Sequence, residues 1–311
     1  MTALLPGRRD RFDRPSTDAG GRPAGDGRAA ALVLVVAALT GVATILAARS
    51  LIGAGYQPSP IGLPDAGPLT AGALPVVRLV QEMAGIAVTG ALLVRLLLGT
   101  GVWPGRWALD HRLGSVTVVW AGVWTAASVA TWVLSLSDLA GVPVTGLPAH
   151  ADVIPLLFGT DRMLSITATL WVAVLLTLFG RRFDGRLGLS VLLAIAVGGL
   201  LPLALTGHVA HHDANITLAT IALAGHVAAA ALWVGGLLVM VVHLRRQPVA
   251  LTVAVPRFSA LALGCVAAVG LSGVVASVAM LDGWTELFAT DRGAITLAKV
   301  AALAALVGVG A

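Results

Sequence analysis

The sequence predicts an all-α, polytopic transmembrane helix bundle of about eight helices with a cytoplasmic N-terminus. The 311 residues are 58% hydrophobic and only 11% charged, whereas soluble domains carry about 25% charged residues. Several apolar runs reach the roughly 20 residues that a helix needs to cross a bilayer. Arginines gather in alternate connecting segments, as they do in membrane proteins with a fixed orientation. The lipid bilayer is therefore the first partner that the sequence predicts.

Each long apolar run is expected to be helical, because a backbone in lipid must satisfy its own hydrogen bonds. No strand-like alternation competes with this interpretation. Residues 1–28 are rich in glycine, proline and arginine, and we expect a disordered cytoplasmic tail there, followed by a transmembrane domain over 29–311. The predicted spans are 29–48, 76–98, 113–136, 163–180, 187–206, 216–242, 258–281 and 294–311.

The distribution of arginine sets the predicted orientation. With the N-terminus inside, the cytoplasmic segments hold fifteen arginines and the outer segments hold four, which is a strong positive-inside signal. The outer loops carry acidic residues instead. Because the arginines lie in short loops, the net charge of +5 does not indicate nucleic-acid binding. We expect a multi-pass protein of the cytoplasmic (plasma) membrane whose 207–215 loop faces outward.

Four of the seven histidines lie at the junction of two apolar runs: His208, His211, His212 and His226. Imidazoles at a water–lipid boundary cost desolvation energy, and neutral imidazole is a good ligand for copper, zinc and haem iron. If the preceding helix continues to His212, the first three share a face, and His226 can approach His208 across a short helical hairpin. The cluster predicts a metal site, although histidines are also tolerated singly at lipid headgroups.

Met83, Met163 and Met280 fall in the outer halves of their predicted helices. Thioethers are soft ligands that select Cu(I). The single cysteine, Cys265, excludes a thiolate pair. Histidine with methionine is the soft set that remains, so copper, as Cu(I), is favoured over zinc. The same methionines also fit the alternative that they are packing residues.

Glu82 and Lys299 are charged residues inside predicted helices, and each has two interpretations. Glu82 stands one turn after Arg78, where it either forms an ion pair near the outer interface or serves as a proton or cation relay beneath the histidines. Lys299 either extends to the interface or pairs with a carboxylate.

Structural roles are predicted for three residues that follow His226. Trp233 lies on the same helical face two turns later, and Gly235 and Gly236 allow a close helix approach. There is no phosphate-binding loop, phosphorylation motif or Ser-His-Asp arrangement in the sequence. We therefore predict a protein that is neither an ATP-driven pump nor an enzyme.

Five segments of the second half of the chain form a distinctive pattern: His226-x6-Trp233-Val234-Gly235-Gly236-Leu237, Arg257-Phe258-Ser259-Ala260-Leu261-Ala262, Leu271-Ser272-Gly273-Val274, Thr290-Asp291-Arg292-Gly293 and Leu297-x-Lys299. With this pattern the chain resembles the copper resistance D (CopD) family of bacterial inner-membrane proteins. The resemblance is strongest over 205–311 and is at the level of topology over 29–180. The chain is similar to the N-terminal half of longer actinobacterial proteins in which a cytochrome c oxidase assembly (CtaG-like) domain follows, so we expect the chain to continue beyond residue 311.

The resemblance implies copper transport or delivery across the cytoplasmic membrane, with the outer histidines receiving copper, for example from an extracytoplasmic chaperone. Two alternatives remain open. In the first, His208 and His226 hold a b-type haem from two sides for electron transfer. In the second, the protein is an assembly scaffold for a cuproenzyme such as cytochrome oxidase, and the histidines have no metal role.

Overall fold

The computed structural model describes residues 64–99, 103–208 and 216–280, together with positions 56, 58, 60 and 101. These residues belong to one compact unit, residues 40–311. The predicted tail 1–28, the predicted spans 29–48 and 294–311, and the loop 209–215 lie outside the described residues. Side chains are described up to residue 202 before this loop and from residue 220 after it.

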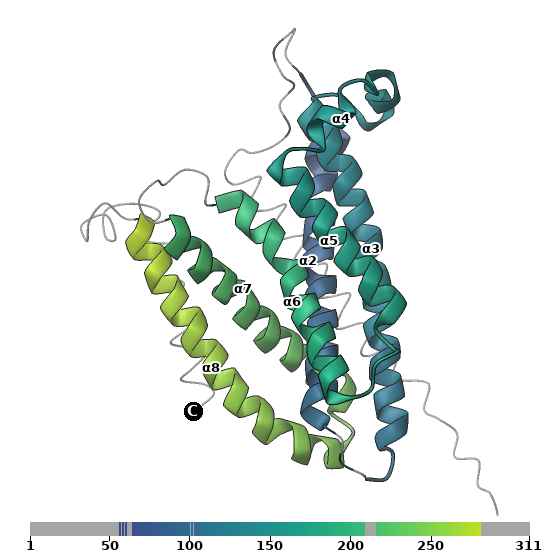
Figure 1. The fold of residues 1–311 in the computed structure, drawn as a ribbon, viewed down its shortest axis with the longest axis vertical. Helices are drawn as coiled ribbons and strands as arrows, with labels where there is room; N and C mark the ends of the chain where they lie inside the picture. Colours follow the sequence, from purple (N-terminus) through teal and green to yellow (C-terminus); the bar gives the residue numbers. More distant parts are fainter. Residues whose placement is uncertain are drawn as a thin grey trace, which may run out of the picture. The chain divides into compact units, whose positions relative to one another are not determined.

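The described residues form a helical bundle, which confirms the predicted fold class (Figure 1). Five of their helical segments are long and apolar enough to cross a membrane, and Arg186–Pro202 is a shorter apolar helix. The elements are α2 (Gly67–Leu98), α3 (Arg106–Ala140), η1 (Val144–His150), α4 (Ile154–Leu157), α5 (Asp161–Phe179), α6 (Arg186–His208), α7 (Ile216–Val239), the π-helical η2 (Met240–Leu244) and α8 (Pro248–Met280).

Three helices begin well before their predicted spans. α2 starts at Gly67 rather than at 76, α3 at Arg106 rather than at 113, and α8 at Pro248 rather than at 258. In α2 and α8 a proline stands in the first two helical positions, where its fixed φ suits a helix and its missing N–H is not needed. The hydropathy of a run marks where lipid begins, whereas a helix continues beyond the lipid until a residue ends it.

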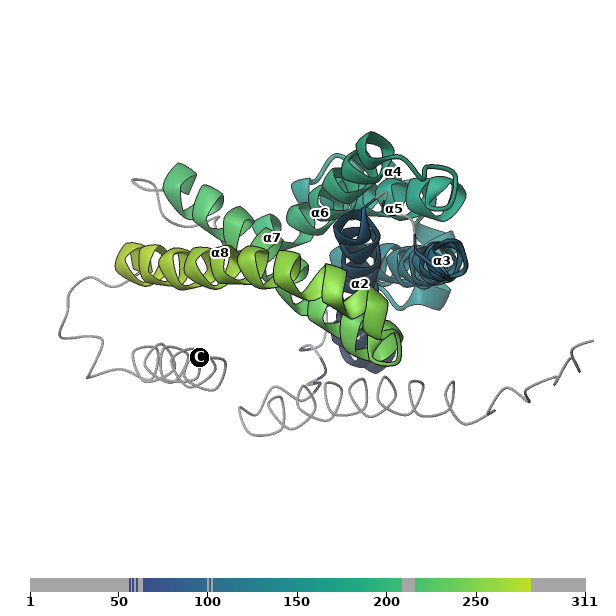
Figure 2. The same cartoon turned by 90° about the horizontal axis from the view of Figure 1, so that it is seen from below.

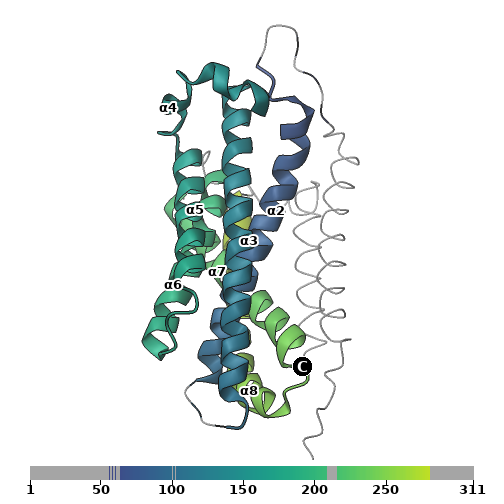
Figure 3. The same cartoon turned by 90° about the vertical axis from the view of Figure 1, so that its right-hand side faces the viewer.

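α2 is the central helix of the described unit: it contacts α3, α6, α7 and α8. In Figures 1 and 2 the α7–α8 hairpin extends to one side of α2, with α3 and α5 on the other. The long contact between α2 and α3 is seen in Figure 3. Trp124 of α3 is fully buried, among Val88 and Leu92 of α2 and Leu200 of α6.

Glycines allow α2 and α7 to cross with their backbones in contact. A Cβ atom on Gly90 would overlap the carbonyl group of Gly235, and a Cβ on Gly235 would overlap the carbonyl oxygen of Ile86. Next to this crossing, Gly236 leaves room for the ring of Phe258 from α8. Small residues at such a crossing are the usual way in which membrane helices approach closely.

A buried arginine joins three segments at the ends that the arginine count predicts to be cytoplasmic, which we call the inner ends; the opposite ends are the outer ends. Arg95 of α2 is 1% exposed, and it pairs with Asp110 of α3 and with Asp184 of the α5–α6 connection at 3.2 and 3.0 Å. It also donates to the carbonyl oxygen of Gly180, at 3.0 Å. Because the charge has several acceptors, its burial is compensated. The network fixes the register of α2 against α3 and α5.

Candidate functional site

The predicted metal ligands differ in how far the structure describes them. His226, Met83 and Met163 are described in full. His208 is the last residue of α6 and Met280 the last of α8, and only their backbones are described. His211, His212 and Lys299 lie outside the described residues.

His226 lies about 15 Å along α7 from the start of that helix at Ile216, at 1.5 Å per residue. Its Nδ1 is 2.9 Å from the hydroxyl oxygen of Ser272 on α8. The side chain of Ser272 is itself largely buried between the two helices. This polar contact therefore joins α7 and α8 in a region where hydrogen-bond partners are scarce.

The hydrogen bonds of Ser272 determine which nitrogen of His226 carries the proton. The Ser272 hydroxyl is 3.0 Å from the carbonyl oxygen of Val269, one turn earlier in α8. A carbonyl oxygen only accepts; when the Ser272 hydroxyl donates its proton there, Nδ1 of His226 is the donor to the Ser272 oxygen. The neutral imidazole then has its lone pair on Nε2, to which none of the described residues is hydrogen-bonded.

Trp233 and the two glycines occupy the inner half of the same helix. Trp233 packs against the cluster that includes Val239, Met240 and Phe258. Gly235 and Gly236 lie at the crossing with α2 and at the contact with α8 described above. The geometry gives these three residues packing roles.

The two predicted methionine ligands whose side chains are described lie in different environments. Met163 is 1% exposed and packs with Leu136, Leu147 and Ile166 at the outer end of α3 and α5. Met83 is exposed on α2. Among the residues that the structure describes, no three His, Cys, Asp or Glu side chains gather where they could hold one metal ion.

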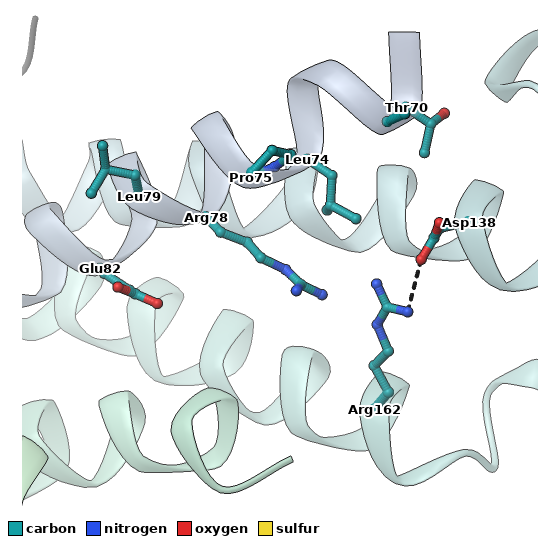
Figure 4. Close-up of a pocket in the computed structure, with 9 residues that line it drawn as sticks. Thr70, Leu74, Pro75, Arg78, Leu79, Glu82, Asp138 and Arg162 are labelled. Atoms are coloured by element: carbon teal, nitrogen blue, oxygen red, sulfur yellow. Dashed lines mark ion pairs between the residues drawn. The ribbon is translucent and has the colours of Figure 1, made fainter. Parts of the chain in front are cut away.

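An open pocket of about 570 Å³ lies between the outer ends of α2, α3 and α5. Figure 4 shows its charged residues, Arg78 and Glu82 of α2, Asp138 of α3 and Arg162 of α5. Arg162 and Asp138 form an ion pair at 2.8 Å. The hydroxyl of Thr70, which also lines the pocket, is 2.8 Å from that of Ser137.

The ion pair expected between Arg78 and Glu82 is absent from the described structure. The Arg78 side chain instead extends toward Asp138 and Arg162, away from the Glu82 carboxylate (Figure 4). The sequence shows that Arg78 and Glu82 are one turn apart on α2. It does not show which ends of other helices lie next to them. The signal in the sequence that could have indicated these neighbours is that Asp138 and Arg162 are also predicted at outer helix ends.

Comparisons with known families match most of the described chain. The model for copper resistance protein D matches residues 252–311, and the model for the copper resistance protein D-like N-terminal domain matches residues 69–218. Comparisons with curated proteins and with solved structures give no match. The matched ranges include the outer pocket and Ser272, while His226 lies between them.

The match over residues 69–218 covers helices whose residues alone indicated a resemblance to the family only at the level of topology. The two models occur here in the order of an N-terminal domain followed by the domain that gives the family its name. Together with the membrane-spanning helices, they show a multi-pass membrane protein with a role in copper resistance or homeostasis. The chain belongs to the copper resistance D family.

Proposed function

We propose that this protein carries copper across the cytoplasmic membrane, or delivers it there, and that copper enters from the outer side through the histidines at the α6–α7 hairpin. The observation that supports this most directly is the environment of His226. Its Nδ1 donates to Ser272, which leaves Nε2 with a lone pair for a metal ion. A histidine oriented in this way by a second residue is typical of metal ligands.

The offset between the histidines supports two successive binding stations rather than one coordination shell. His208 ends α6, and His211 and His212 follow it in the sequence; these three are the proposed outer station. His226, about 15 Å along α7, is the inner station. Copper bound by three imidazoles at the outer station and then by the single imidazole of His226 is held strongly enough to be captured and weakly enough to be released, as a cargo must be.

The same offset argues against the haem alternative. Two histidines that hold one iron from opposite sides place their ligand nitrogens within a few ångströms of each other. His208 is the last residue of α6, whereas His226 lies about 15 Å inside α7 from the start of that helix. Cu(I) remains the favoured cargo because the chain offers soft thioethers and no thiolate pair.

Two kinds of partner are proposed for this function: one that supplies copper on the outer side of the membrane, and one that receives it. An extracytoplasmic copper chaperone would supply the outer station, since the described outer surface carries no methionine-rich capture motif. An oxidase-assembly partner, or a fused domain after residue 311, would receive the metal.

The experiment is Cu(I) loading of the detergent-purified protein, with copper counted per chain. The variants are His226→Ala, the triple His208/His211/His212→Ala, and all four together. The matched control is His150→Ala, because His150 is an exposed histidine on the same side whose Nδ1 is 3.0 Å from the carbonyl oxygen of Gly146. We expect near-stoichiometric copper in the wild type and in the control, and loss of copper in the fourfold variant.

Transport in proteoliposomes separates the two stations. The triple variant should slow copper entry at low copper concentration, whereas His226→Ala should stop passage while the outer station still binds. Equal copper content in the wild type and the fourfold variant would remove the histidines from the mechanism. In that case the scaffold alternative would become the better account.

A further inference from the structure

The outer pocket contains an arginine that forms no ion pair with the described residues. Arg78 takes part in none of the ion pairs of the described structure, and its Nε is buried without a hydrogen-bond partner. An arginine side chain cannot lose its proton in a protein. Burying part of an unpaired guanidinium is costly, so a partner from outside the described residues would stabilise this arrangement.

The carboxylates in the pocket do not supply that partner. Asp138 is bound to Arg162, and Glu82, although only one turn from Arg78, lies on the far side of it (Figure 4). The guanidinium groups of Arg78 and Arg162 thus enter the same pocket; of its two carboxylates, Asp138 already binds Arg162, and that of Glu82 lies away from both guanidinium groups. Two like charges that converge in this way favour a negative group between them.

The position of the pocket along α2 places it near the outer boundary of the membrane. From Arg78 to Arg95, α2 rises about 25 Å, which is close to the roughly 30 Å thickness of the hydrocarbon core. Because the Arg95 network of ion pairs marks the inner end, Arg78 stands at the level of the outer headgroups. Negative groups are available there from phospholipids and from the extracytoplasmic solution.

We propose that this pocket, between the outer ends of α2, α3 and α5, is an oxyanion-binding site in which Arg78 and Arg162 hold a phosphate or carboxylate group. The planar guanidinium donates two parallel hydrogen bonds to such a group. The site does not depend on the copper stations, because it uses arginines rather than soft ligands and lies at a different set of helix ends.

The experiment measures two probes on the delipidated full chain in a phosphate-free detergent. Inorganic phosphate is titrated while thermal unfolding is followed, because a ligand that binds the folded state raises the midpoint. In parallel, native mass spectrometry counts the phosphatidylglycerol that each variant retains. The variants are Arg78→Gln and Glu82→Gln, and the control is Arg182→Gln, which removes the charge of an exposed arginine outside the pocket.

Arg78→Gln should weaken binding about tenfold or more, because charge-assisted hydrogen bonds are lost. Glu82→Gln should tighten binding, since it removes a neighbouring negative charge, and Arg182→Gln should leave binding within about twofold of the wild type. If Arg78→Gln weakens only the binding of phosphatidylglycerol, the anionic group in the pocket comes from a lipid. If it weakens only the binding of phosphate, the group belongs to a soluble oxyanion. Equal binding in the wild type and Arg78→Gln for both probes, or binding equally weakened by Arg182→Gln, would overturn the proposal.

Discussion

At the scale of single residues, the hydroxyl of Ser272 is expected to control the copper affinity of His226. Ser272→Ala removes the acceptor for Nδ1, so that the imidazole can rotate and change tautomer. Loss of a group that orients a metal ligand typically costs 10–100-fold in affinity, and we expect about that loss here. Ser272→Thr keeps a hydroxyl and should remain close to the wild type.

The measurement is competition for Cu(I) with a chromogenic chelator, in the triple His208/His211/His212→Ala background, so that His226 is the remaining station. The control is Ser115→Ala, since the Ser115 hydroxyl donates to a helix carbonyl, at 2.9 Å, as that of Ser272 does. Equal affinities for Ser272→Ala and Ser272→Thr would show that the hydroxyl does not orient the ring.

At the scale of helices, the crossing of α2 and α7 depends on its glycines. Gly90→Ala places a methyl group against the Gly235 backbone, and overpacking of this kind costs about 1–3 kcal/mol. Gly198→Ala on α6 meets no atom within 4 Å, so it should gain up to about 1 kcal/mol from the higher helix propensity of alanine. Thermal unfolding in detergent should therefore move in opposite directions for the two variants, and a shift in the same direction would contradict the packing account.

At the scale of the whole molecule, the arginine count predicts which helix ends face outward. In a Cys265→Ser background, His150→Cys before α5 should react with a membrane-impermeant thiol reagent in intact cells. Arg182→Cys, in the α5–α6 connection, should react only after the membrane is made permeable, because that connection is predicted to be cytoplasmic. Labelling of the two positions in the reverse order would invert the orientation and the outward direction assigned to the histidines.

The sequence predicted the described spans well, because lipid imposes a simple requirement of length and apolarity on each helix. It predicted contacts between helices less well. The expected Arg78–Glu82 pair follows from spacing along one helix, whereas Arg78 extends toward residues of two other helices. Likewise, Ser272 is part of the segment Leu271-Ser272-Gly273-Val274 that carries the family resemblance, but its hydrogen bond to His226 joins residues 46 positions apart. Such contacts depend on how whole helices pack.

The glycine crossing also has a mechanical meaning. α2 and α7 touch backbone to backbone at Gly90 and Gly235, and His226 stands about 13 Å farther out along α7. That contact can act as a pivot, with the outer part of α7 as a lever arm. A tilt of about 10° there would move the His226 backbone by roughly 2 Å, and the hydrogen bond to Ser272 would draw α8 with it. A movement of this size would leave both helices intact and would still change the position of His226 relative to the rest of the bundle.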